Sequence, residues 1–228
     1  PTPAEIAYWG GYFFYHNRLH RNYQDDISLH YYLLASKDGI TIGKRYFKHE
    51  NNKEDYPFSP SGHNLYDNNS KLYYCRDFDN IVYQIHEDSV VPRFRINLPN
   101  PLLASMIEER PNEMSLLRSG YSLGITDIYE YGGLLFFRFV KDGYIWSCLY
   151  NVEESKQVYC AKRIKFLDSS LIDTIDGIYK DCFYSILTPE YLDYAFSENP
   201  LEDYPDLFKT YDVEGDNPVI AFYRAVVR

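Results

Sequence analysis

The chain has 228 residues, of which 45% are hydrophobic and 18% aromatic, and its formal net charge is −10. The hydrophobic share is large enough for a packed core and argues against disorder. The acidic balance argues against nucleic-acid binding, which needs clustered Lys and Arg. No run of 18 apolar residues is present, so no membrane span is predicted.

Strand-forming residues fill the first 48 positions. The 25 Tyr and 14 Phe of the chain favour strands, because flat side chains suit a pleated, half-buried surface. We predict strands within Ile6–Asn17, Ile27–Ala35 and Ile40–Lys48. Gly10-Gly11 and Ser36-Lys37-Asp38-Gly39 are predicted turns between them, since Gly accepts the positive φ of tight hairpins.

The same pattern follows between Leu65 and Leu98. Predicted strands cover Leu72–Arg76, Ile81–His86 and Val90–Ile96, and polar turns at Asp77–Asn80 and Glu87–Ser89 separate them. The next segment contains good helix formers and predicts a short helix at Leu102–Glu109, which Pro111 would end.

The stretch Tyr131–Ile164 holds three apolar runs, cut by turns at Lys141-Asp142-Gly143 and Asn151–Gln157. Gly132-Gly133 predicts a further hairpin turn. Cys148 and Cys160 are equidistant from Glu154 in the second turn, so they could face each other and form a disulfide. Two ordinary buried thiols are the alternative, and it is the one we favour.

The last part repeats the pattern with a helix inserted. Ile175–Leu187 predicts two strands joined by a turn at Lys180-Asp181. Thr188 and Pro189 then predict the start of a helix that extends to Phe196. After a proline-bearing loop, Asn217–Val227 predicts a final strand.

The strands form a repeat. Aromatic-rich strands begin near Tyr12, Leu72, Leu134 and Cys182, at spacings of 60, 62 and 48 residues, and a short segment ending in Tyr or Trp precedes each. A four-stranded antiparallel sheet that recurs about every 40–60 residues is typical of β-propeller blades. We therefore predict an all-β fold, a single β-propeller domain over residues 1–228 with about four blade units and short helical insertions.

Three stretches carry a family resemblance: "LYYCRDFDNIVYQIHEDSVVPRFRINL", "GIYKDCFYSILTPEYL" and "GDNPVIAFYR". Together they resemble the six-bladed β-propeller proteins of Bacteroidetes, many of them predicted exported lipoproteins. The resemblance implies a protein of the periplasm or cell surface, with a lipid anchor on a segment ahead of Pro1, and it supplies no catalytic residues. Six blades need roughly 250–300 residues. Either two N-terminal blades are missing, so that this chain is the C-terminal part of a longer six-bladed propeller, or the propeller is smaller, or a partner closes it.

Aromatic side chains at the ends of the predicted inner strands are the candidates for ligand binding, because they could stack on sugar rings or pack against a protein. They are Tyr8, Trp9, Tyr66, Tyr129 and Trp146. The alternative is that they fill the space between blades. We predict a non-catalytic binding or scaffold module for a protein or glycan ligand.

Two other functions stay open. A carbohydrate hydrolase or lyase would place paired carboxylates at the channel mouth, and the acids near inner-strand ends are Asp127, Glu130, Asp173, Asp176 and Asp181. A structural piece would complete its ring with another chain. No metal site or cofactor is predicted, because His16 and His20 lie near a strand end and the acidic loops depart from the calcium-binding pattern.

Overall fold

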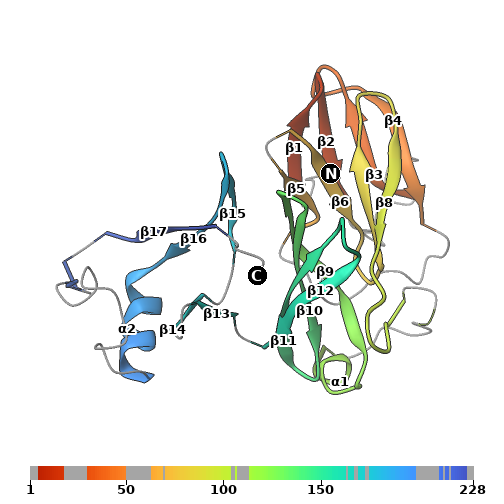
Figure 1. Cartoon of the computed structure of the whole chain (residues 1–228). Coiled ribbons are helices and arrows are strands. Elements are labelled where there is room, and N and C mark those ends of the chain that lie inside the picture. The colour runs from red at the N-terminus through yellow and green to blue at the C-terminus, as the bar shows by residue number, and fades with distance from the viewer. Residues whose placement is uncertain are drawn as a thin grey trace. The chain divides into compact units, whose positions relative to one another are not determined.

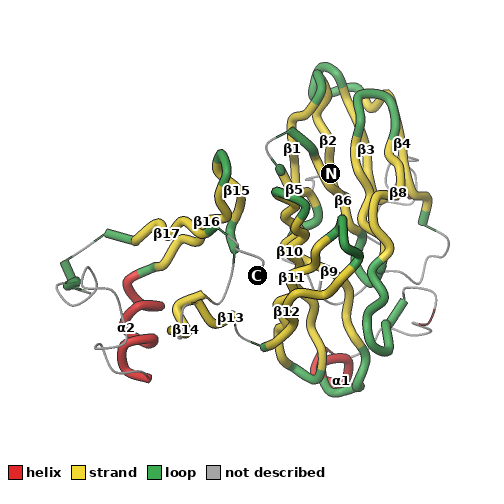
Figure 2. Tube along the Cα trace, in the orientation of Figure 1, coloured by secondary structure: helices red, strands yellow, loops and turns green. Residues whose placement is uncertain are grey.

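The computed structural model describes residues 5–17, 30–49, 63–68, 70–103, 106, 113–162, 164–166, 169–172, 175–198, 211–212, 214–215 and 217–224. The chain divides into two compact units. The first comprises Pro1–Ile128 with Phe137–Ile145, and the second Tyr129–Phe136 with Trp146–Arg228. Antiparallel strands form most of the described chain, as the arrows of Figure 1 and the yellow segments of Figure 2 show.

The first sheet is a four-stranded meander. Its strands, in sheet order, are β1 (Glu5–Trp9), β2 (Tyr12–His16), β3 (Tyr31–Ser36) and β4 (Ile42–Lys48). The prediction for this region is confirmed, although residues 27–29 of the second predicted strand lie outside the described residues. Strand β4 begins two residues later than predicted, because the Asp38 carboxylate accepts the N–H groups of Ile40 at 2.9 Å and Thr41 at 2.7 Å.

The second sheet repeats the first. Its strands, again in sheet order, are β5 (Leu65–Asp67), β6 (Leu72–Cys75), β7 (Ile81–Ile85) and β8 (Val90–Arg95). Each strand predicted between Leu72 and Ile96 is present, within one residue of its predicted end. Regular alternation with polar turns is therefore enough to locate a meander of this kind.

The third sheet has the longest strands. They are β9 (Ser122–Tyr131), β10 (Leu134–Lys141), β11 (Tyr144–Asn151) and β12 (Lys156–Ala161). Their order in the sheet is β12-β11-β10-β9, so this sheet is a meander too. A two-stranded sheet of β13 (Ile164–Phe166) and β14 (Ser169–Ile172) follows, and the sequence did not predict it.

The fourth sheet contains three described strands where the sequence repeat predicted four. They are β15 (Gly177–Tyr179), β16 (Cys182–Leu187) and β17 (Val219–Tyr223), in that order. Residues 225–227 of the last predicted strand lie outside the described residues. The architecture is thus mostly β, with four antiparallel sheets of three or four strands.

In the first unit, side chains link the first strand of each sheet to the next sheet. The Glu5 carboxylate accepts the backbone N–H groups of Asn64 at 2.6 Å and Leu65 at 3.0 Å. The Asn68 amide donates to the carbonyl oxygen of Ile128 at 3.1 Å. Consecutive first strands are therefore neighbours, as in a propeller whose blades surround an axis.

Apolar clusters lie between consecutive sheets. One cluster combines buried residues of the first two sheets: Phe14, Tyr32, Leu33, Ala35, Leu65, Leu72, Tyr74, Tyr83 and Ile85. In the second unit, another cluster combines residues of β10, residues of the fourth sheet and Ile175, which precedes that sheet: Leu134, Phe136, Ile175, Ile178, Phe183 and Tyr223. A thin sheet buries its faces only by stacking on a neighbour, and these clusters are the product of that stacking.

The two described helices differ in how well they were predicted. Helix α2 (Pro189–Glu198) begins where expected, and the Thr188 hydroxyl caps it by accepting the N–H of Tyr191 at 3.3 Å. Helix α1 (Glu113–Leu117) lies beyond Pro111 and was not predicted. Most of the helix predicted at Leu102–Glu109 lies outside the described residues. Of its described residues, Leu102 is buried, and its N–H donates to the carbonyl of Ser122 at 2.9 Å. No described helix is long and apolar enough to cross a membrane.

The cysteine prediction was also wrong. Cys148 and Cys160 face each other in the register of β11 and β12 and form a disulfide with a Cα–Cα distance of 4.1 Å. Cys75 and Cys182 are free thiols. The equal spacing of Cys148 and Cys160 from Glu154 correctly indicated that they face each other. Our preference for two reduced thiols was wrong.

Candidate ligand-binding pocket

The aromatic residues predicted to bind ligand lie in different environments. Tyr8 is 65% exposed, whereas its neighbour Trp9 packs against the cluster between the first two sheets. Tyr66 is only 3% exposed, and its hydroxyl donates to the carbonyl of His63. The burial of Tyr66 favours a structural role over ligand contact.

The other two candidates belong to the second unit and are half-buried. The Tyr129 hydroxyl donates to the carbonyl of Asp176 at 3.0 Å, and its ring stacks on Phe136. The Trp146 ring lies under the ammonium group of Lys162, 5.8 Å from its centroid. Both side chains are used within the protein, and ligand contact by any of the five stays a prediction.

The acids predicted for a hydrolase also have partners within the protein. Asp127 is buried and accepts a hydrogen bond from Arg138 Nε at 2.6 Å. Asp176 accepts the N–H of Ile186 at 2.7 Å, and Asp173 lies outside the described residues. Within the described part of the chain, no group of three or more His, Cys, Asp or Glu is placed to hold a metal ion.

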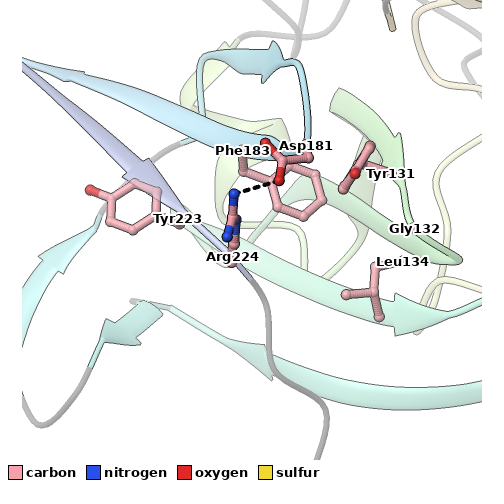
Figure 3. Close-up of a pocket in the computed structure, with 7 residues that line it drawn as sticks. All are labelled: Tyr131, Gly132, Leu134, Asp181, Phe183, Tyr223 and Arg224. Atoms are coloured by element: carbon pink, nitrogen blue, oxygen red, sulfur yellow. Dashed lines mark hydrogen bonds and ion pairs between the residues drawn. The ribbon is translucent and has the colours of Figure 1, made fainter.

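The second unit contains a cavity of about 290 Å³ (Figure 3). Residues of the β9–β10 hairpin form one side and residues of the fourth sheet form the other. The lining consists of Tyr131, Gly132, Leu134, Asp181, Phe183, Tyr223 and Arg224. Aromatic walls with a few convergent polar groups are the usual composition of a small-molecule site.

Two tight turns position this lining. Gly132 and Gly133 connect β9 to β10 with φ of 57° and 75°, a combination that favours glycine at both turn positions. Lys180 and Asp181 connect β15 to β16, and Lys180 also has a positive φ of 53°. Each turn joins the first strand of its sheet to the second. The pocket therefore lies where equivalent ends of the two sheets meet.

Packing below the turns fixes the aromatic wall. Tyr131 meets Phe183 edge to face, with centroids 6.4 Å apart and an interplanar angle of 87°. Phe183 and Tyr223 are opposite each other in the register of β16 and β17, and both are buried. Burial raises the pKa of Tyr223 above its usual value, so its hydroxyl stays protonated.

A charged pair is part of the pocket lining. Arg224 Nη2 donates to Asp181 Oδ2 at 2.5 Å, and both side chains are mostly exposed. A hydrogen bond to Cys182 and the charge of Asp181 raise the pKa of Arg224, which therefore remains a cation. Exposed pairs of this kind exchange partners easily, so both groups can turn to a ligand.

Of the seven lining residues, the sequence had singled out only Asp181, and for a different role. The other six come from three segments that are far apart in the chain. The one signal in the sequence was that two turns, Gly132-Gly133 and Lys180-Asp181, occupy equivalent places in the repeat. Strand periodicity predicted the turns, but it carries no information about which turns meet.

Comparisons with known proteins agree with this architecture. The model of the DUF5128 family, a 6-bladed beta-propeller, matches residues 7–170. A solved structure of a Bacteroides fragilis NCTC 9343 protein, itself predicted to be exported, is similar with a TM-score of 0.73. The identity is 15%, and the likeness covers 99% of this chain and 66% of that chain, so this chain spans about two thirds of the relative's length. A search of curated proteins returned no match.

Proposed function

Because the chain belongs to the DUF5128 family of six-bladed β-propellers, we propose that it is an exported, non-catalytic binding module that recognises a glycan in the pocket between its third and fourth sheets. The observation that carries the proposal is the pocket lining. Three aromatic side chains stand beside an exposed ion pair, Asp181–Arg224. A sugar ring has apolar C–H faces for the aromatic rings and hydroxyl groups for the charged pair.

The size of the cavity supports a small ligand. At about 290 Å³ it is near the lower end of ligand pockets, and it fits one sugar unit or the end of a chain. A protein partner would need a larger contact surface, on the order of 800 Å² per partner. We therefore place the glycan ahead of a protein ligand for this pocket.

The acids of the lining favour binding over hydrolysis. Glycoside hydrolysis uses two carboxyl groups about 5–9.5 Å apart. Among the described residues of the lining, Asp181 is the one acid, and it is paired with Arg224. This arrangement can hold a hydroxyl group, but it does not supply a separate acid and nucleophile.

Two features support export to the periplasm or cell surface. The Cys148–Cys160 disulfide is of a kind that persists in oxidising compartments. The Bacteroides fragilis relative is predicted to be exported as well. The two observations are independent, since one concerns covalent chemistry and the other the fold family.

A glycan array followed by calorimetry on the best ligand tests the binding site. We expect Tyr131→Leu and Arg224→Gln each to weaken binding at least about tenfold, a loss of roughly 1.4 kcal/mol. Tyr144→Leu and Arg118→Gln are matched controls, because both residues are exposed and neither lines the pocket. The proposal fails if no glycan binds, or if pocket variants and controls bind equally well.

A further inference from the structure

One residue of the pocket lining has no side chain. Gly132 is the first residue of the β9–β10 turn, is exposed, and has a φ of 57°. A positive φ is a common reason for glycine at a turn, because most side chains avoid that region. Packing against a neighbouring side chain is the other common reason. Equivalent turns of this chain allow each reason to be checked for Gly132.

The backbone conformation of the turn does not require glycine at this position. Lys180 is the first residue of the β15–β16 turn, which joins the same pair of strands in the fourth sheet, and its φ is 53°. Asp142 is the first residue of the β10–β11 turn, with a φ of 54°. Both residues carry side chains at nearly the same φ as Gly132. Asn and Asp adopt this region more readily than other residues with side chains.

Packing explains two other turn glycines but not Gly132. A Cβ added to Gly10, the first residue of the β1–β2 turn, would lie 3.0 Å from Cγ of Glu87. A Cβ added to Gly133 would lie 3.2 Å from the carboxyl carbon of Glu153. For Gly132, no heavy atom of the described residues, its chain neighbours aside, lies within 4 Å of such a Cβ.

The other side of the same turn is firmly held. The carbonyl of Gly133 accepts the N–H of Val152 at 2.8 Å, and the Glu153 carboxyl group lies against the Gly133 α-carbon. The N–H of Glu153 donates in turn to Asn151 Oδ1 at 3.0 Å. The β11–β12 turn therefore supports the β9–β10 turn, and the Gly132 backbone is a fixed surface of the pocket.

We infer that Gly132 is a specificity-determining residue of the pocket, and that the ring of the bound sugar packs directly on its backbone. This inference rests on the proposed glycan binding. Figure 3 shows Gly132 on the hairpin that carries Tyr131 and Leu134 into the lining. A cavity of about 290 Å³ holds one sugar unit, so a side chain at Gly132 would compete with the ligand for space that protein atoms leave free.

Calorimetry with the best ligand of the glycan array tests this contact. Gly132→Asn should weaken binding at least about tenfold, because the new side chain occupies the space of the sugar ring. Gly11→Asn is the matched control. Gly11 has a φ of 79°, is exposed, lies outside the pocket lining, and no heavy atom of the described residues, its chain neighbours aside, lies within 4 Å of an added Cβ. It should bind as the parent protein does.

Melting temperatures separate ligand contact from a general effect on folding. Asn at a positive φ should lower the melting temperature of both variants by a similar, small amount. A loss of binding in Gly132→Asn alone then reflects the pocket.

A second measurement needs no substitution and is therefore independent of how Gly132→Asn folds. The chain has 12 glycines, so protein labelled with ¹³C and ¹⁵N at glycine gives a simple NMR spectrum. When the ligand is added, the Gly132 signal should shift, and its α-protons should show NOEs to the ring protons of the sugar. The Gly11 signal should stay unchanged.

The outcomes distinguish this inference from the proposal on which it rests. If no glycan binds, the proposed function and the inference both fail. A glycan whose binding is weakened by Tyr131→Leu, but not by Gly132→Asn, would overturn the inference alone. Equal losses in Gly132→Asn and Gly11→Asn, or a bound sugar without NOEs to Gly132, would overturn it as well. A selective loss in Gly132→Asn together with these NOEs supports it.

Discussion

Arg76 combines one acidic partner with three aromatic neighbours in the first unit. Its Nε and Nη2 atoms donate to Asp79 Oδ2 at 2.8 and 2.5 Å. The rings of Phe47, Tyr32 and Tyr83 lie 5.1, 5.8 and 6.0 Å from its guanidinium carbon. Burial alone would lower the pKa of Arg76, but the neighbouring Asp79 carboxylate outweighs burial and raises it. The half-buried guanidinium therefore lies beside the apolar cluster between the first two sheets.

We expect Arg76→Ala to destabilise the protein by about 3 kcal/mol, because it leaves the buried Asp79 carboxylate without its cation. Urea unfolding followed by circular dichroism measures the change. Arg224→Ala is the matched control, since Arg224 makes the same type of pair on the surface, with Asp181. Its unfolding midpoint should match that of the parent protein. Equal losses in the two variants would contradict this account.

At the residue scale, the sequence predicted the type of chemistry but not the residues that perform it. The sequence indicated Tyr66 and Asp181 as candidates because both lie near the ends of predicted first strands. In the structure, Tyr66 is buried, whereas Asp181 lines the pocket. Exposure depends on which sheet edges meet, and that depends on contacts between distant segments. Tyr223 and Arg224 could not be predicted as site residues. The sequence predicted the strand that contains them, but not that the end of this strand lies at the pocket.

Strands and turns were predictable because their signals are local. The alternation of apolar residues, and turns such as Gly132-Gly133, each depend on a few neighbouring residues in the chain. The helix predicted at Leu102–Glu109 lies mostly outside the described residues and stays a prediction. Leu102 itself is buried with Phe78 and Leu123, a contact between distant segments that local helix propensity does not describe. The short strands β13 and β14 were missed, since three or four residues carry too little pattern.

The hairpin of β11 and β12 carries its own covalent link. Replacing both Cys148 and Cys160 with Ala should lower the free energy of unfolding by roughly 3 kcal/mol, because the disulfide restricts a short loop in the unfolded chain. Cys182→Ala is the control and should have little effect, as Cys182 is free. Denaturant titration of the two variants measures the difference. No loss in the double variant would show that the link does not stabilise the fold.

At the scale of the whole molecule, the repeat was the decisive signal. Spacings of 60, 62 and 48 residues predicted blades, and the family match and the four sheets confirm the propeller. The sequence could not predict how this chain relates to a closed ring of blades. Local patterns predict the strands of each sheet, but they do not describe the surfaces through which sheets pack on one another. A single domain over residues 1–228 stays a prediction.

The proposed export leads to a prediction that thiol counting can check. Protein recovered from the cell envelope and denatured without reductant should show two reactive thiols, Cys75 and Cys182, because the other two cysteines are joined. Reduction should raise the count to the four cysteines of the sequence. Four thiols before reduction, or recovery from the cytoplasm alone, would argue against export.

The insertion that contains α2 has a consequence for how the protein folds. Residues 188–218 separate β16 from β17, whereas two-residue turns join β9 to β10 and β15 to β16. Bringing β17 to β16 therefore costs more chain entropy than closing either hairpin. Helix α2 forms through contacts close in sequence and supplies part of the surface on which Val219 and Ala221 pack. The fourth sheet should thus be among the last to assemble, after its neighbouring hairpins have formed.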